Sequence, residues 1–153
     1  AMARVRQAKK AERASIKRRK EAIKTIAQLI ADAQIVFNAF IRERDKGKGC
    51  FVCGRPFTDK PGQVQHAGHV RSRGAAGHLR FNEDNCHGEC EGCNGPHGAK
   101  PHQIEAGAIA RIGAERYAAL CADNTPHKWQ RDELIAIKHE YRAKLKELKG
   151  RTC

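Results

Sequence analysis

Apolar residues recur at helical spacing along the first 46 residues of the chain. From Ile23 onward they are separated by steps of three and four, the pattern of a coiled-coil-like seam. Proline and glycine are absent up to Lys46, and Gly47 and Gly49 follow. The pattern therefore predicts one long N-terminal helix, within an expected domain of residues 1–48. The seam consists of Ile16, Ile23, Ile26, Ile30, Ala33, Phe37 and Phe40.

This seam has two possible uses. It can pack against the rest of the same chain, or it can pair with a second subunit. A helix of some 40 residues would extend roughly 60 Å, since each residue adds about 1.5 Å. The remainder of the chain is small beside that length. The pattern therefore favours a homodimer and leaves packing within the chain as the alternative.

The middle of the chain, residues 49–100, is rich in Gly, His, Cys and Asn and has no long helical pattern. Gln63–Val70 is the expected strand of a β-hairpin, and a short helix should begin near Cys90. Residues 101–153 return to helical spacing, with a final helix expected from Gln130 to Lys149. The predicted fold class is mainly α, with a small β-hairpin core between a long N-terminal helix and C-terminal helices. The seam of the final helix consists of Leu134, Ile137, Tyr141, Leu145 and Leu148.

The charge of the chain suggests a class of partner. Lys and Arg number 30 against 17 Asp and Glu, a formal net charge of +13. The first 24 residues hold ten of the basic residues and two of the acidic ones. This helix is therefore expected to contact a polyanion, most simply DNA, with a solvated face or a protein partner as the alternatives. The candidate DNA contacts on it are Lys17, Arg18, Arg19 and Lys20.

The hydropathy of the chain bears on where it acts. No run reaches the roughly 18 to 20 apolar residues that span a bilayer. The basic N-terminus also lacks the apolar stretch of a signal peptide. We therefore expect a cytoplasmic protein with no membrane partner.

Two Cys-x-x-Cys pairs bracket the middle region. Cys50 and Cys53 form the first pair, Cys90 and Cys93 form the second, and 36 residues separate the two. Each pair presents two thiolates to one ion, so together they complete a tetrahedral zinc shell. We expect a closed structural Zn²⁺ site, with a redox pair or unrelated thiols as the alternatives. Cys86 is expected to be a packing residue.

Histidines and asparagines between and after these pairs follow the order of an HNH, or ββα-metal (His-Me finger), nuclease. That order is a histidine on a strand, a central asparagine, and an asparagine or histidine on the helix after a Cys-x-x-Cys pair. In such a site a divalent cation is held against the scissile phosphate, and a neutral histidine takes a proton from the attacking water. The products are expected to carry 5′-phosphate and 3′-hydroxyl ends.

The motif of the middle region resembles that of the phage lambda NinG (Rap) family of recombination proteins. It reads His66-Ala-Gly-His69-Val-Arg-Ser-Arg-Gly74, Leu79-Arg-Phe-Asn82-x-x-Asn85-x-His87, and Cys90-x-x-Cys93-Asn94. Segments 38–45 and 109–113 are similar too, and the resemblance covers roughly residues 35–148. It implies a resolvase of Holliday junctions and other branched DNA. The layout is also similar to that of phage endonuclease VII, which acts as a dimer. NinG proteins usually carry a further cysteine-rich segment upstream that has no counterpart here, which indicates a short or shortened member.

The resemblance also implies roles for particular residues. His69 matches the general base, Asn85 the central asparagine, and Asn94 the metal ligand on the helix. An aspartate is expected for the family where this chain has His66, and HNH enzymes in general place one where it has Gly68. His66 is the expected substitute ligand and His97 a candidate second ligand on the helix. The catalytic ion is expected to be Mg²⁺ or Mn²⁺, with softer neutral ligands favouring Mn²⁺.

These observations predict a metal-dependent endonuclease that resolves branched DNA in recombination, in a bacterial cell carrying the phage or prophage. The main rival is a zinc-stapled protein that binds junctions without cutting them, because the expected carboxylate is missing. A general HNH nuclease, or a recruiter of recombination proteins, would also fit the motif and the charge. Recognition should be of backbone and branch shape. The candidate phosphate contacts near the motif are Arg71, Arg73 and Arg80.

Overall fold

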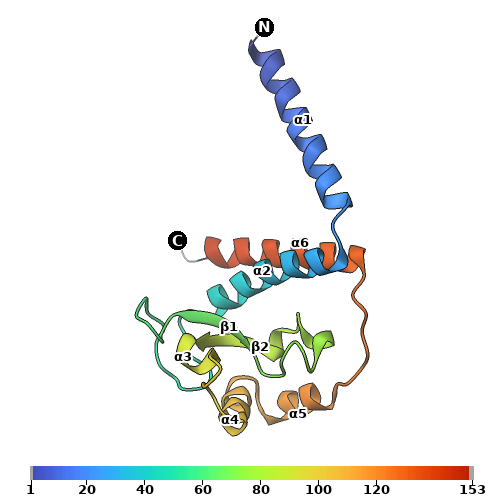
Figure 1. Cartoon of the computed structure of the whole chain (residues 1–153). Helices are drawn as coiled ribbons and strands as arrows, with labels where there is room; N and C mark the ends of the chain where they lie inside the picture. Colours follow the sequence, from blue (N-terminus) through green and yellow to red (C-terminus); the bar gives the residue numbers. More distant parts are fainter. Residues whose placement is uncertain (1, 152–153) are drawn as a thin grey trace.

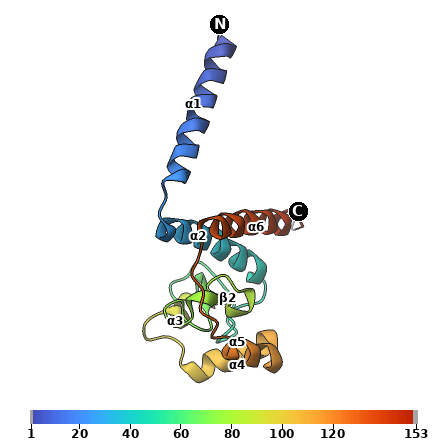
Figure 2. The ribbon, with the colours of Figure 1, turned by 90° about the vertical axis from the view of Figure 1, so that its right-hand side faces the viewer.

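The computed structural model describes residues 2–151 of the chain. A helical arm leads into a layered body, in which a two-stranded hairpin lies between one pair of helices and another (Figures 1 and 2). The pair α2 and α6 covers one side of the hairpin, and α4 and α5 lie on the other. The elements are α1 (Met2–Ala22), α2 (Ile26–Asp45), β1 (Gln65–His69), β2 (Cys86–Cys90), α3 (Glu91–Asn94), α4 (Pro101–Ile112), α5 (Ala114–Ala122) and α6 (Arg131–Gly150), with 3-10 turns at Gly77–Leu79 and Glu83–Asn85.

The main core forms where α2 packs against α6. Phe37 of α2 meets Tyr141 of α6 edge to face, with ring centroids 4.7 Å apart, and meets Phe81 at 5.7 Å. Such aromatic pairs add stabilisation beyond their buried area. The predicted final helix is confirmed, and the second half of the N-terminal seam packs within the chain. Buried members of this core include Leu29, Ala33, Phe40, Ile41, Cys86 and Leu134.

The hairpin follows the expected strand closely. β1 and β2 pair antiparallel, so that His66 lies opposite Glu89 and His69 lies opposite Cys86. Sixteen residues connect the two strands, from Val70 to Asn85, and they contain both 3-10 turns. The predicted short helix after Cys90 is present as α3. The mainly helical class with a small hairpin is therefore confirmed.

The prediction of a single N-terminal helix from the sequence is wrong. The chain breaks after Ala22, and α2 starts afresh at Ile26 with Thr25 as its N-cap. Thr25 and Gln28 form a capping box, in which each side chain accepts a hydrogen bond from the other residue's backbone N–H. The Ser/Thr-x-x-Glu/Gln signature of such a box was present in the sequence and signals this start without any proline or glycine.

Arg131 of α6 stabilises the same break. Its guanidinium donates to the carbonyl oxygens of Glu21 and Lys24, groups that a continuous helix would have used internally. Lys24 in turn reaches forward to Asp32, with Nζ 2.5 Å from a carboxylate oxygen. Tertiary contacts and the capping box therefore both stabilise the break between α1 and α2.

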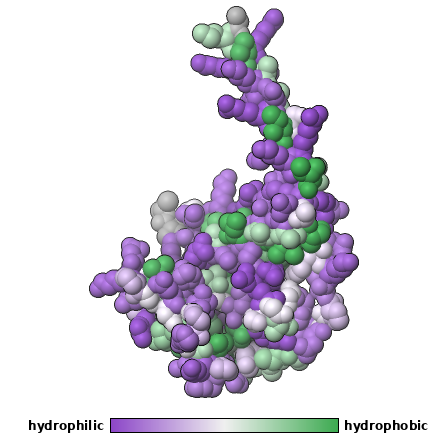
Figure 3. Space-filling view, in the orientation of Figure 1, coloured by the Kyte–Doolittle hydropathy of each residue, from purple (hydrophilic) through white to green (hydrophobic). Residues whose placement is uncertain are grey.

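Helix α1 extends from the body as an isolated arm, and it has no buried residue. Figure 3 shows hydrophilic side chains along most of the arm with separate hydrophobic groups between them. Ile16 and Ile23 are 46% and 80% exposed, so the first part of the predicted seam is unpartnered in this chain. Among residues 2–151, no helix combines the length and the apolar character needed to cross a membrane.

Candidate metal centre and hairpin site

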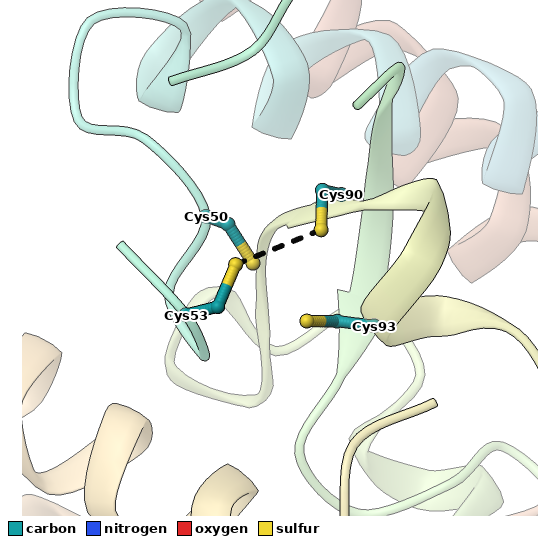
Figure 4. A group of neighbouring side chains, drawn as sticks. All are labelled: Cys50, Cys53, Cys90 and Cys93. Carbon is teal, nitrogen blue, oxygen red and sulfur yellow. Dashed lines mark hydrogen bonds between the residues drawn. The ribbon is translucent and has the colours of Figure 1, made fainter. Parts of the chain in front are cut away.

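The four predicted zinc ligands converge at one end of the hairpin (Figure 4). Their sulfur atoms all lie within 4.8 Å of one another, and Sγ of Cys53 is 3.8 Å from Sγ of Cys90. With Zn–S bonds of about 2.3 Å, sulfurs at the corners of a tetrahedron would lie about 3.8 Å apart. The donor set and its spacing therefore fit a tetrahedral Zn²⁺ ion.

The backbone around Cys50 and Cys53 forms a tight turn that brings the two thiols together. Gly54 has φ +72°, and its N–H donates to the carbonyl of Cys50 at 2.9 Å, which closes the turn that carries both thiols. Burial and the neighbouring sulfurs of Cys90 and Cys53 raise the pKa of the Cys93 thiol. Because zinc binds thiolates, loading of the site should release protons. The cysteine cluster can thus join β2 to the segment that follows α2.

The central asparagine is buried and organises the segment between the strands. Asn85 is 0% exposed, and its side-chain amide donates to the carbonyls of Arg71 and Leu79 at 3.0 and 3.2 Å. Its side-chain oxygen accepts from the Arg71 backbone N–H at 2.8 Å. The residue therefore ties the exit of β1 to the turn that precedes β2.

The predicted base contacts that same turn. Nε2 of His69 lies 3.0 Å from the carbonyl oxygen of Arg80, the residue after Leu79. Nδ1 lies 3.9 Å from Sγ of Cys86, which is fully buried as expected of a packing residue. Burial raises the pKa of the Cys86 thiol to about 12, so the thiol stays protonated. Both contacts favour the tautomer in which Nε2 carries the proton and donates to the Arg80 carbonyl, while Nδ1 is the acceptor and faces the Cys86 thiol.

Electrostatics keep this imidazole neutral. Burial lowers the pKa of His69 below its ordinary value, and the positive charges of Arg73 and Arg80 act in the same direction. The hydrogen bond to the Arg80 carbonyl opposes them without reversing the shift. A neutral imidazole near pH 7 is what a general base requires.

The opposite face of the hairpin carries an arrangement that the sequence did not predict. His66, Gly68 and Glu89 share this face, because alternate residues of a strand point to opposite sides. Glu89 is 5% exposed, and burial raises its pKa to about 7. A Cβ added to Gly68 would lie 1.9 Å from Oε2 of Glu89. By the same alternation, His66 and His69 point to opposite faces, and His69 is the last residue of β1.

The two predicted ligands on the helix side lie at the surface. Asn94 ends α3 directly after Cys93, and its side chain is exposed. His97 is also exposed, and it lines a hollow together with Cys53 and Cys93. Within residues 2–151 the four cysteines are the one group of three or more His, Cys, Asp or Glu side chains whose ligand atoms converge. The catalytic metal set is therefore still a prediction.

The predicted phosphate contacts divide into two kinds. Arg71 is engaged inside the fold, where its guanidinium donates to the carbonyls of Leu120 and Asp123 at 3.0 and 2.6 Å. Arg80 donates to Gln34 at 3.3 Å, whereas Arg73 is exposed beside the hairpin. The four basic candidates on the arm are all exposed, at Lys17, Arg18, Arg19 and Lys20.

A buried carboxylate fastens the hairpin to α2. Asp45 accepts from the Gly88 backbone N–H at 2.8 Å and from Arg44 at 2.8 and 2.7 Å. Lys48 adds a fourth bond at 3.2 Å. Burial alone would raise the pKa of Asp45, but the Arg44 guanidinium and these hydrogen bonds hold it well below its usual range.

The fold and the cysteine cluster define a class of protein: small, basic and mainly helical, with a two-stranded hairpin next to four cysteines that can bind one metal ion. The family described as "Bacteriophage Lambda NinG protein" matches residues 1–151. The chain therefore belongs to the NinG family of bacteriophage proteins.

Individual relatives agree with this assignment. Protein ninG of Escherichia phage lambda is 39% identical over 137 residues, covering 88% of this chain and 64% of the relative. Protein ninG of Escherichia phage 933W is 38% identical over 137 residues, with coverages of 88% and 65%. Protein ninG of Salmonella phage P22 is 38% identical over 134 residues, with coverages of 88% and 64%. The chain thus spans slightly less than two thirds of the length of these relatives. No solved structure matches it.

Proposed function

We propose that this NinG protein is a metal-dependent HNH-type endonuclease that cuts branched DNA, including four-way junctions, in the cytoplasm of the phage's bacterial host. The observation that carries the proposal is the connection from Asn85 through the turn at Arg80 to the ring of His69. Buried Asn85 holds the Leu79 carbonyl, and the next carbonyl of the same turn, that of Arg80, fixes one imidazole nitrogen of His69 as a donor. The second ring nitrogen, Nδ1, is therefore the acceptor.

The chain's own residues account for most of the reaction. Nδ1 of His69 would take a proton from the water that attacks phosphorus, and the ring stays neutral beforehand because its pKa is lowered. A divalent ion, Mg²⁺ or Mn²⁺, would offset the charge that develops on the leaving 3′ oxygen. His66 and Asn94 are the proposed ligands from the hairpin and the helix, with His97 as a further candidate. Because His66 and His69 point to opposite faces of β1, the proposal requires the phosphate to lie at the end of this strand, where His69 is the last residue.

The arm supplies the proposed DNA contact. Most of the stability of a helix in a protein comes from packing of one face, and α1 has no buried residue, so α1 is expected to be stabilised by a partner. Its exposed basic side chains suit the phosphate backbone, which carries no base sequence information of its own. The exposed seam residues Ile16, Ile23 and Ile26 are candidates for contact with a second copy, and a homodimer would present two arms and two sites to one junction.

The non-catalytic alternative rests on one observation. β1 offers no carboxylate at His66 or Gly68, where a nuclease of this kind is expected to carry one. A protein with the same hairpin, zinc site and arm could bind branched DNA without cutting it. Recruitment of further recombination proteins through the arm is compatible with either activity.

Cleavage of a labelled four-way junction and of a matched linear duplex, in Mg²⁺ and in Mn²⁺, tests the proposal. We expect paired cuts near the branch point that disappear in His69→Ala and persist in His102→Ala, a control at an exposed histidine on α4. Equal cutting of both substrates would indicate a general nuclease. Tight junction binding with no cutting in either metal would establish the non-catalytic alternative.

A further inference from the structure

Glu89 is a buried carboxylate without a partner. It is 5% exposed, and it makes no hydrogen bond or ion pair with the part of the chain that the structure describes. Asp45, the second buried carboxylate next to the hairpin, accepts bonds from three residues. A buried charge is costly unless it is paired or coordinates a metal. No contact within residues 2–151 therefore compensates for the burial of the Glu89 carboxylate.

The position of this carboxylate indicates the role. Glu89 lies directly opposite His66 in the hairpin register and diagonally opposite Gly68. Its Oε2 lies 1.9 Å from the point where a Cβ of Gly68 would stand, and its own Cβ and Cδ lie 2.9 Å from that point. The Glu89 side chain thus fills the space of a side chain at position 68. That position immediately precedes the proposed base, His69.

We propose that Glu89 is the carboxylate ligand of the catalytic divalent cation, supplied from β2 because β1 carries none. The inference rests on the proposed function and deepens it by naming a ligand. His66 faces Glu89 across the strand pair and completes a pair of ligands from the hairpin, one imidazole and one carboxylate. Neither side chain has a hydrogen bond within residues 2–151, so both are free to bind an ion.

The chemistry of this pair favours a particular ion. Carboxylate oxygens are preferred by hard cations such as Mg²⁺ and Mn²⁺, while imidazole suits transition metals. A mixed pair should therefore bind Mn²⁺ better than Mg²⁺. This arrangement also explains why position 68 is a glycine, because any side chain there would displace the Glu89 carboxylate.

Binding of Mn²⁺ to the zinc-loaded chain of 153 residues tests the assignment without relying on activity. Free Mn²⁺ is followed by electron paramagnetic resonance during titration of the wild type, Glu89→Gln and the control Glu115→Gln, which removes an exposed carboxylate on α5. We expect one Mn²⁺ per chain in the wild type and control, and affinity at least about 10-fold weaker in Glu89→Gln. Equal affinity in Glu89→Gln, or no Mn²⁺ binding by the wild type, would overturn the inference.

Two further variants keep the test decisive if Glu89→Gln folds poorly. Gly68→Ala retains every ionisable group but places a methyl group where the carboxylate lies, so it should weaken Mn²⁺ binding as well. The double variant His66→Asp with Glu89→Gln moves the carboxylate to the paired position on β1 and should restore binding. Normal Mn²⁺ affinity in Gly68→Ala, or no recovery in the double variant, would count against Glu89 as the ligand.

The outcome separates this inference from the proposed function. Junction cutting by the wild type together with unchanged Mn²⁺ affinity in Glu89→Gln leaves the nuclease in place and removes Glu89 from its metal site. Mn²⁺ binding that depends on Glu89, in a protein that cuts no DNA, supports the ligand and rejects the nuclease.

Discussion

Asn85 and Asp45 are both fully buried, and each joins two segments of the chain through its side chain. Asn85 joins the exit of β1 to the turn before β2, and Asp45 joins the end of α2 to the backbone of β2. A hairpin of two five-residue strands has little apolar surface of its own, so it depends on such contacts and on the metal site. Individual polar residues therefore position the site as much as the core does.

The acid sensitivity of the protein should follow from Asp45. Its pKa is lowered in the folded state, so its stabilising contribution is complete above the unfolded value of about 3.9 and is lost as the pH falls below it. Asp45→Asn leaves Arg44 without its buried partner and should cost about 3 kcal/mol at neutral pH. Urea unfolding of the wild type and the variant at neutral pH measures this difference.

Asp59→Asn is the matched control, because Asp59 is an exposed carboxylate in the loop before β1. It should change stability by no more than about 0.5 kcal/mol. If both variants unfolded at the same urea concentration, the contacts of Asp45 would contribute nothing to stability.

At the scale of secondary structure elements, the break between α1 and α2 separates two functions of one helical sequence. From Ile30 onward the seam residues are used in the core with α6, while Ile16, Ile23 and Ile26 remain exposed. The arm can therefore be loaded with basic side chains without disturbing the packing of the body. Its exposed apolar residues and its charge are both left for a partner.

The N-cap at this break gives a prediction with a definite sign. Thr25→Ala removes the side-chain oxygen that accepts from the Gln28 backbone N–H, and should destabilise the protein by about 1 kcal/mol. In a continuous helix the same change would be neutral or stabilising, since alanine has the highest helix propensity. Thermal unfolding of Thr25→Ala beside Ser15→Ala, a change inside α1, distinguishes the two cases. A gain in stability for Thr25→Ala would instead indicate a single continuous helix.

At the scale of the whole molecule, the cysteine cluster connects segments that are distant in sequence. Cys50 and Cys53 follow α2. Cys90 is the last residue of β2, and Cys93 lies in α3. Binding of one ion there would fix the hairpin relative to α2 and order the chain that leads to α4. The proposed site on the hairpin would therefore depend on this metal centre, in which a zinc ion would have a structural role only.

Removal of the metal should accordingly unfold the middle of the protein. We expect one zinc per chain, and a chelator should lower the melting temperature and abolish cooperative unfolding of the hairpin region. Cys93→Ser should have the same effect, while Cys121→Ser, at an exposed thiol on α5, should leave zinc content and melting temperature unchanged. Metal analysis with circular dichroism measures both. Full cooperativity after complete zinc loss would contradict a structural role for the cluster.

The sequence by itself determined the parts of this protein that depend on local pattern. Helical periodicity predicted α6 and the helical nature of residues 2–45, and the two Cys-x-x-Cys pairs predicted the convergence that the structure shows. The motif from His66 to Asn94 also pointed to the NinG family, which the comparisons confirm. These features are set by neighbours within a few residues or by spacing along the chain.

Only the tertiary structure decided what distant residues do to one another. The end of α1 is capped by Arg131, more than a hundred residues away, and part of the seam expected to pair subunits is covered by α6. Glu89 had no motif to mark it, because its significance comes from strand register, from burial and from a glycine on the opposite strand. Pairing across strands and the loss of water around a charge are properties of the folded chain, so no pattern along the sequence could supply them.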